Sequence, residues 1–112
     1  MTALPRETEN RRLVALACRV MAVAGLFDMH GHISLRDGDV AYINGRRTSR
    51  IAVTPGEVAI VSVADGAVVA GEPPAETPLH LGCYRARPEI RSASHYHPLA
   101  ATAFATDRKS VV

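Results

Sequence analysis

The sequence contains no tryptophan, and aromatic residues make up only 4% of it. A membrane-spanning helix requires roughly 20 consecutive apolar residues, and no apolar run in the sequence is near this length. We therefore expect no membrane-spanning helix. Glu7 and Glu9 precede the first apolar segment, so we do not expect a signal peptide there. The apolar fraction is still 47%, mainly alanine and valine, so we expect a cytoplasmic protein with one domain over residues 1–112.

Cysteine and lysine are scarce as well. The two cysteines, Cys18 and Cys83, stand apart in apolar helical segments, so we expect buried thiols rather than a disulfide. All but one of the 13 basic residues are arginine, and they are scattered apart from Arg11-Arg12 and Arg46-Arg47. With a formal net charge of +2, the chain lacks the basic surface typical of nucleic-acid-binding proteins.

Apolar periodicity and turn signals predict a mixture of helices and strands. Asp37-Gly38 and Asp65-Gly66 are typical of hairpin turns, and Thr77 before Pro78 is typical of a helix cap. The predicted elements are a helix over 5–25, strands over 32–36, 40–44, 58–63 and 67–70, a helix over 78–87, a strand over 90–96 and a helix over 98–105. The apolar side chains predicted to face the core are Leu13, Leu16, Ala17, Val20, Met21 and Ala24 in the first helix and Leu79, Gly82, Cys83 and Ala86 in the second.

The most informative segment is Ser94-His95-Tyr96-His97-Pro98, at the end of the last predicted strand. Residues two apart on a strand point to the same face, so we expect the imidazoles of His95 and His97 side by side. Two imidazole nitrogens on one face are a common way to hold a divalent metal ion. The alternative is that this frequent pattern has no ligand function here.

A second His-x-His pattern surrounds Gly31, between His30 and His32. A glycine there permits close approach of the backbone to a ligand. The alternative is a polar turn with two solvated histidines. Further along, Arg46 and Arg47 lie in a polar loop, which is usually a solvated surface, but guanidinium groups also bind carboxylate or phosphate through paired hydrogen bonds.

Glu76 lies just ahead of the second predicted helix. A carboxylate at this position can face a pocket, where it can move protons to and from a carbon atom or a hydroxyl group. Its alternative role is a favourable interaction with the helix dipole.

In their order along the chain, these segments resemble the class II aldolase/adducin family, from about Leu13 to Ala105. The ordered set is far more specific than any one motif. The matching segments are Gly31-His32-Ile33-Ser34, Ile43-Asn44 with Val53-Thr54-Pro55, Val61 to Asp65-Gly66, Pro74-Ala75-Glu76-Thr77-Pro78-Leu79-His80, Tyr84-Arg85-Ala86-Arg87-Pro88, and Ser94-His95-Tyr96-His97-Pro98 with Ala101-Thr102-Ala103-Phe104.

The resemblance implies an α/β fold of three layers, α/β/α, with a mainly antiparallel central sheet. It implies a divalent metal ion, zinc before manganese, held by three histidines, two of which match His95 and His97. The acid/base glutamate of the family matches Glu76, and its Gly-Asn pair for the substrate's anionic group matches Gly31 and His32. The third histidine of the family lies beyond the last residue given, so we expect the N-terminal half of the domain. A small-molecule substrate and a homo-oligomer, tetrameric at full length, are implied too, without nucleic acid or membrane.

The chain departs from the sugar-phosphate aldolases where they bind substrate. It has His32 in place of asparagine, Pro74-Ala75 in place of two serines and Arg46-Arg47 in place of Thr-Gly. These changes remove small hydrogen-bonding groups, whereas Arg46 and Arg47 could bind a carboxylate. We therefore expect a metal-dependent carbon–carbon lyase, aldolase or decarboxylase, for a small hydroxy-carbonyl or hydroxy-acid substrate. The alternative is a non-catalytic adducin-like fragment that serves in assembly or is inactive through truncation.

Overall fold

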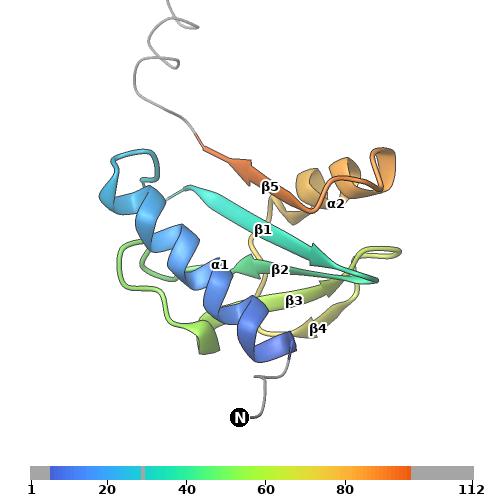
Figure 1. Ribbon diagram of the computed structural model, residues 1–112, viewed down its shortest axis with the longest axis horizontal. Coiled ribbons are helices and arrows are strands. Elements are labelled where there is room, and N and C mark those ends of the chain that lie inside the picture. The colour runs from blue at the N-terminus through green and yellow to red at the C-terminus, as the bar shows by residue number, and fades with distance from the viewer. Residues whose placement is uncertain (1–5, 29, 97–112) are drawn as a thin grey trace, which may run out of the picture.

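The computed structural model describes residues 6–28 and 30–96. Its elements are α1 (Arg6–Val23), β1 (His32–Asp37), β2 (Val40–Asn44), the 3-10 turn η1 (Pro55–Glu57), β3 (Val58–Ser62), β4 (Val68–Ala70), α2 (Thr77–Ala86) and β5 (Ser92–His95) (Figure 1). The five strands form one sheet in the order β4-β3-β2-β1-β5, and all neighbours are antiparallel. The predicted strands and the first two predicted helices are confirmed apart from their ends, while the helix predicted over 98–105 lies outside the described residues.

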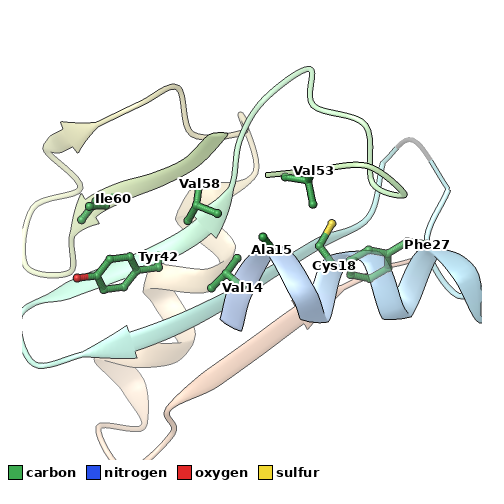
Figure 2. Packing of buried hydrophobic residues seen from close by; sticks show 8 residues of the cluster. All are labelled: Val14, Ala15, Cys18, Phe27, Tyr42, Val53, Val58 and Ile60. Carbon is green, nitrogen blue, oxygen red and sulfur yellow. The ribbon is translucent and has the colours of Figure 1, made fainter. Parts of the chain in front are cut away.

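The two helices cover opposite faces of this sheet, which confirms the expected α/β fold with three layers (Figure 1). Successive strand residues point to opposite faces, so Tyr42 belongs to one core and Ala41 to the other. The core on the α1 side is drawn in Figure 2 and contains Val14, Ala15, Cys18, Phe27, Tyr42, Val53, Val58 and Ile60. The core on the α2 side contains Ala41, Val61, Val63, Leu81 and Tyr84.

The buried face of α1 is not the one predicted. Leu13 and Leu16 are each 41% exposed and Val20 is 57% exposed. The buried side chains of this helix are Val14, Ala15 and Cys18. In a segment this rich in alanine and valine, apolar residues lie on several adjacent faces, so periodicity alone selected the neighbouring one. In the part of the chain that is described, no helix has the length and apolar character needed to cross a bilayer.

The α2 helix also differs from the prediction. It begins at Thr77, and Glu76 is its N-cap residue, because the hydroxyl of Thr77 donates back to the carbonyl of Pro74 at 2.6 Å instead of capping the helix. The buried side chains of α2 are Thr77, His80, Leu81 and Tyr84. Leu79 is 57% exposed and Cys83 is exposed, so the expectation of a buried thiol is correct for Cys18 and wrong for Cys83. Polar residues take the inward face of α2 because the sheet supplies partners for them.

Candidate functional site

Two histidines on neighbouring strands define the candidate site. In the pairing of β1 with β5, His32 lies directly opposite His95, and Ser34 lies opposite Ala93. Side chains that are directly opposite in an antiparallel pair share one face of the sheet. Because Ser34, two residues after His32, contacts His80 on α2, this is the α2 face. The rings of His32 and His95 have centroids 6.2 Å apart.

Glu76 reaches these histidines from the beginning of α2. Its side chain makes no capping hydrogen bond. Instead, Oε2 of Glu76 lies 2.6 Å from Nδ1 of His95 and 3.6 Å from Nδ1 of His32. The structure thus brings together Glu76, His95 and His32, for which the sequence predicted three different roles. The predicted partner of His95, His97, lies outside the described residues.

The same three residues fit a metal ion. Their donor atoms all lie within 4.8 Å of one another. Tetrahedral ligands at about 2.1 Å from zinc are about 3.4 Å apart, close to the separation of His32 from Glu76. Nδ1 of His32 is buried without a hydrogen-bond partner in the described part of the chain, which is costly unless a ligand satisfies it. Imidazole nitrogen and carboxylate oxygen are zinc donors, so the set is chemically suited to such an ion.

The surroundings of His32 favour the neutral form of its imidazole, which is the form that binds a cation. Burial lowers the pKa of His32 below its usual value, the positive charge of Arg50 lowers it further, and the carboxylate of Glu76 raises it. The net direction is downward, so the imidazole is neutral at pH 7. A metal ion requires the neutral form of histidine, because only that form has a free nitrogen lone pair.

A cavity of about 640 Å³ opens beside His32 and Glu76. It is lined by His30, His32, Arg46, Arg47, Thr48, Ser49, Arg50, Pro74, Ala75 and Glu76. The two arginines predicted to bind substrate therefore share a cavity with the histidine and the glutamate. Three guanidinium groups around one carboxylate favour an anionic ligand. Arg47 has a φ of 63°, a backbone conformation that is uncommon for a residue with a side chain and is often found at ligand sites.

Gly31, the remaining residue predicted to bind substrate, is not among the residues that line this cavity. A Cβ atom at this position would lie 2.3 Å from the ring of Phe27. The structure therefore supplies a packing reason for the glycine, because only a hydrogen atom fits between the backbone and the ring.

Asn44 and Arg50 hold the backbone on either side of His32, and the sequence patterns assigned neither to the site. The side-chain amide of Asn44 donates to the carbonyl of Gly31 at 3.2 Å and accepts from the amide of Ile33 at 2.8 Å. Nε of Arg50 donates to the same carbonyl of Gly31 at 2.9 Å. The sequence contained one signal for the role of Asn44. This asparagine ends an apolar strand, and a side-chain amide that is buried there must find hydrogen-bond partners.

Comparisons with known proteins agree with this architecture. The family model of the class II aldolase and adducin N-terminal domain matches residues 12–111. A 3,4-dihydroxyphthalate decarboxylase of Terrabacter sp. (strain DBF63) is 39% identical, over 84% of this chain and 44% of the relative. An L-fuculose phosphate aldolase of Methanococcus maripaludis is 32% identical, over 70% of this chain and 44% of the relative. The chain thus spans less than half the length of these curated relatives.

Solved structures share the fold. An L-fuculose 1-phosphate aldolase superposes with a TM-score of 0.81 at 21% identity, over 89% of this chain and 49% of the other. An aldolase II superfamily protein from Pseudomonas syringae superposes with a TM-score of 0.80 at 24% identity, over 92% of this chain and 44% of the other. The arrangement of five antiparallel strands with helices on both faces therefore recurs in these proteins.

Proposed function

Because this chain belongs to the class II aldolase and adducin family, we propose that it forms the metal- and substrate-binding part of a carbon–carbon lyase. We propose that the reaction is the decarboxylation of a hydroxylated aromatic carboxylate and that it depends on a zinc ion. The observation that carries the proposal is the cluster of His32, Glu76 and His95 at the edge of a cavity lined by three arginines. The name of the decarboxylase relatives supports this class of substrate, since 3,4-dihydroxyphthalate carries two carboxylates and two adjacent hydroxyl groups.

We assign the metal ion to His95, to His32 and to the predicted ligand His97. His32 was expected to bind substrate, and its Nδ1, which lies near Glu76 and His95 and has no hydrogen-bond partner in the described part of the chain, supports a role as ligand. When bound, the ion would act as a Lewis acid that stabilises negative charge on a substrate oxygen.

We assign proton transfer to Glu76. Loss of carbon dioxide leaves an electron pair on the ring carbon, and that carbon must receive a proton. Glu76 lines the cavity and is half-exposed, so its carboxylate can contact a bound substrate, take a proton from one of its hydroxyl groups and return that proton to the ring carbon. Arg46 and Arg47 would hold a carboxylate of the substrate through charge-assisted hydrogen bonds.

A sugar-phosphate aldolase is the second candidate, because several relatives are named L-fuculose phosphate aldolase. Thr48 and Ser49 bring hydroxyl groups to one part of the cavity wall, but the part next to Glu76 favours the carboxylate. Phosphate sites are typically built from backbone amides and small hydroxyl donors. Pro74 and Ala75 line this cavity, and proline has no amide proton while alanine has no hydroxyl group.

The test uses the 112-residue chain after loading with zinc or with manganese. Release of carbon dioxide from 3,4-dihydroxyphthalate and release of aldehyde from L-fuculose 1-phosphate are measured separately, and both assays are repeated with Arg46→Ala and Arg47→Ala. We expect zinc-dependent release of carbon dioxide. In each variant the rate should fall about tenfold or more, because the substrate loses one charge-assisted hydrogen bond. If the chain cleaves the sugar phosphate at the same rate in the wild type and in both variants, the aldolase becomes the better assignment. Zinc binding without either reaction would support the non-catalytic alternative.

A further inference from the structure

A buried polar chain links α2 to the sheet next to the metal-binding candidates. Oγ of Ser34 lies 2.7 Å from Nδ1 of His80 and 2.6 Å from the hydroxyl of Tyr84. Ser34 is 1% exposed, His80 2% and Tyr84 0%, so these groups are shielded from bulk solvent. The other ring nitrogen of His80, Nε2, is buried and has no hydrogen-bond partner among residues 6–28 and 30–96. Such an atom is costly to bury and requires an explanation.

The hydrogen bonds of this chain decide where the proton of His80 lies. His80 is 2% exposed, and a charge on its ring would be costly to bury, so the ring is neutral and carries one proton. Burial raises the pKa of Tyr84, so its hydroxyl group keeps its proton. A serine hydroxyl donates one hydrogen bond and accepts two. If Tyr84 donates to Ser34 and Ser34 donates to Nδ1, both short contacts are hydrogen bonds, and the imidazole proton is on Nε2.

The opposite arrangement leaves a buried proton without an acceptor. A proton on Nδ1 would be donated to Ser34, and Ser34 would donate to Tyr84. The hydroxyl proton of Tyr84 would then have no hydrogen-bond acceptor among residues 6–28 and 30–96. If Tyr84 also donated to Ser34, the hydroxyl of Ser34 would be left with the carbonyl of Ala93 at 3.5 Å, which is long for a hydrogen bond of a hydroxyl group. The first arrangement satisfies more buried groups and therefore favours the tautomer that presents Nε2–H.

His80 borders the candidate site. Its ring meets the ring of His32 edge to face, with centroids 6.4 Å apart. His80 and His95 also line a small cavity of about 190 Å³, together with Leu79, Cys83, Ala93 and Ser94. His95 in turn contacts Glu76. A group that enters this cavity lies against both imidazoles, next to the proposed metal ligands.

We propose that His80 is a further substrate-contacting residue, a neutral imidazole that donates a hydrogen bond from Nε2 to an oxygen atom of the substrate. This inference rests on the proposed function, in which His32 and His95 hold the metal ion that acts on the substrate. A donor in a dry site stabilises the negative charge that develops on such an oxygen in the transition state. Ser34 and Tyr84 act through His80 as positioning residues, because they keep the proton on Nε2.

The tautomer is tested on the 112-residue chain labelled with ¹⁵N, by long-range ¹H–¹⁵N spectra of the histidine rings at pH 7. The spectra are recorded without metal and with zinc, and His80→Asn identifies the signals of His80. We expect a protonated Nε2 and an unprotonated Nδ1. A proton on Nδ1 would overturn the inference, because Nε2 would then be an acceptor. This measurement needs no turnover, so its failure is distinct from a failure of the proposed function.

The substrate contact is tested with a matched pair of variants. Asparagine places its amide near the position of Nδ1 and has no group near Nε2, whereas glutamine places an amide donor near Nε2. For 3,4-dihydroxyphthalate we expect His80→Asn to lower kcat about 100-fold with little change in KM, at unchanged zinc content and melting temperature, and His80→Gln to restore part of kcat. Wild-type kcat in His80→Asn, or equal losses in both variants, would overturn the contact and leave His80 a packing role.

Discussion

Glu76 occupies two positions at once, the N-cap of α2 and the carboxylate nearest to His95. Asparagine, aspartate, serine and threonine are the usual N-cap residues because their short side chains reach back to the first amides of the helix. Glu76 makes no such bond and directs Oε2 toward His95 instead. The side chain of Glu76 therefore contributes to the candidate site and not to the helix cap. The position of this residue at the start of α2 directs its carboxylate toward the histidines.

Replacement of this carboxylate separates proton transfer from metal binding. We expect Glu76→Gln to lower kcat about 100-fold or more, since an amide cannot accept and return a proton. We expect the zinc content to stay at the wild-type level, because the proposed ligands are histidines. Turnover and bound zinc are measured on the same preparation. Undiminished turnover would leave Glu76 with no part in the mechanism, and loss of zinc would make it a ligand.

Gly31 carries a prediction of its own. We expect Gly31→Ala to destabilise the chain by roughly 1–3 kcal/mol, because its Cβ would lie 2.3 Å from the ring of Phe27 and the core is already filled there. Urea denaturation measures the change in the free energy of unfolding. In a Phe27→Leu background the same substitution should cost less, since the smaller side chain leaves room. An equal cost in both backgrounds would contradict the steric explanation.

At the scale of the elements, the site is a product of strand pairing and of one helix. The pairing of β1 with β5 places His32 opposite His95, although the two residues are far apart in the sequence. The α2 helix adds Glu76 at its start, and it is held against β1 by the bonds of Ser34 to His80 and Tyr84. The stability of this helix on the sheet therefore depends on the protonation state of His80.

The pH dependence of unfolding follows from the burial of His80, which is the main cause of its lowered pKa. The pKa of His80 is about 4 in the folded chain and near 6.5 in the unfolded chain, so between these values the unfolded chain binds more protons. This contribution is fully present above pH 6.5 and is lost as the pH falls toward 4, up to roughly 3 kcal/mol. Urea denaturation at a series of pH values, with a chelator present, measures it. We expect a shallower acid slope in His80→Gln; parallel slopes would exclude His80 as the cause.

At the scale of the whole molecule, the three layers place the candidate site on one side of the sheet only. The α1 face is filled by an apolar core (Figure 2). The α2 face carries an apolar core at one end and the two histidines at the other. A metal ion held by His32 and His95 would connect β1 and β5. We therefore expect the metal to stabilise the entire fold and not only the site.

Zinc should accordingly raise the melting temperature of the chain. At a free zinc concentration of about 100 times the dissociation constant, the expected stabilisation is about 2.7 kcal/mol, and a chelator should reverse it. For a domain of this size that corresponds to a shift of roughly 10 °C or more. His95→Ala is the control, measured by the same thermal denaturation. An equal shift in this variant would place the bound zinc elsewhere on the chain.

The local pattern of the sequence determined which segments form strands and helices and which residue types carry the chemistry. Alternation predicted β1 and β2, the Asp-Gly pairs predicted the turns, and the motifs singled out Glu76 and His95 as residues with a chemical role. These features depend on neighbours along the chain, which is why a single sequence predicts them. The order of motifs was also enough to indicate the family.

Only the tertiary structure decided which of these residues meet. Whether His32 faces His95 depends on the register of β1 against β5, and register is set by contacts between segments distant in sequence. The same is true of the bonds that Asn44 and Arg50 make beside His32 and of the bond between His80 and Ser34, because each joins residues distant in sequence. The inward face of each helix was likewise decided by what the sheet offers: apolar residues opposite α1, and Ser34 opposite the polar residues of α2. Pairing and packing between distant segments are cooperative, so their outcome is a property of the folded whole and not of any local pattern.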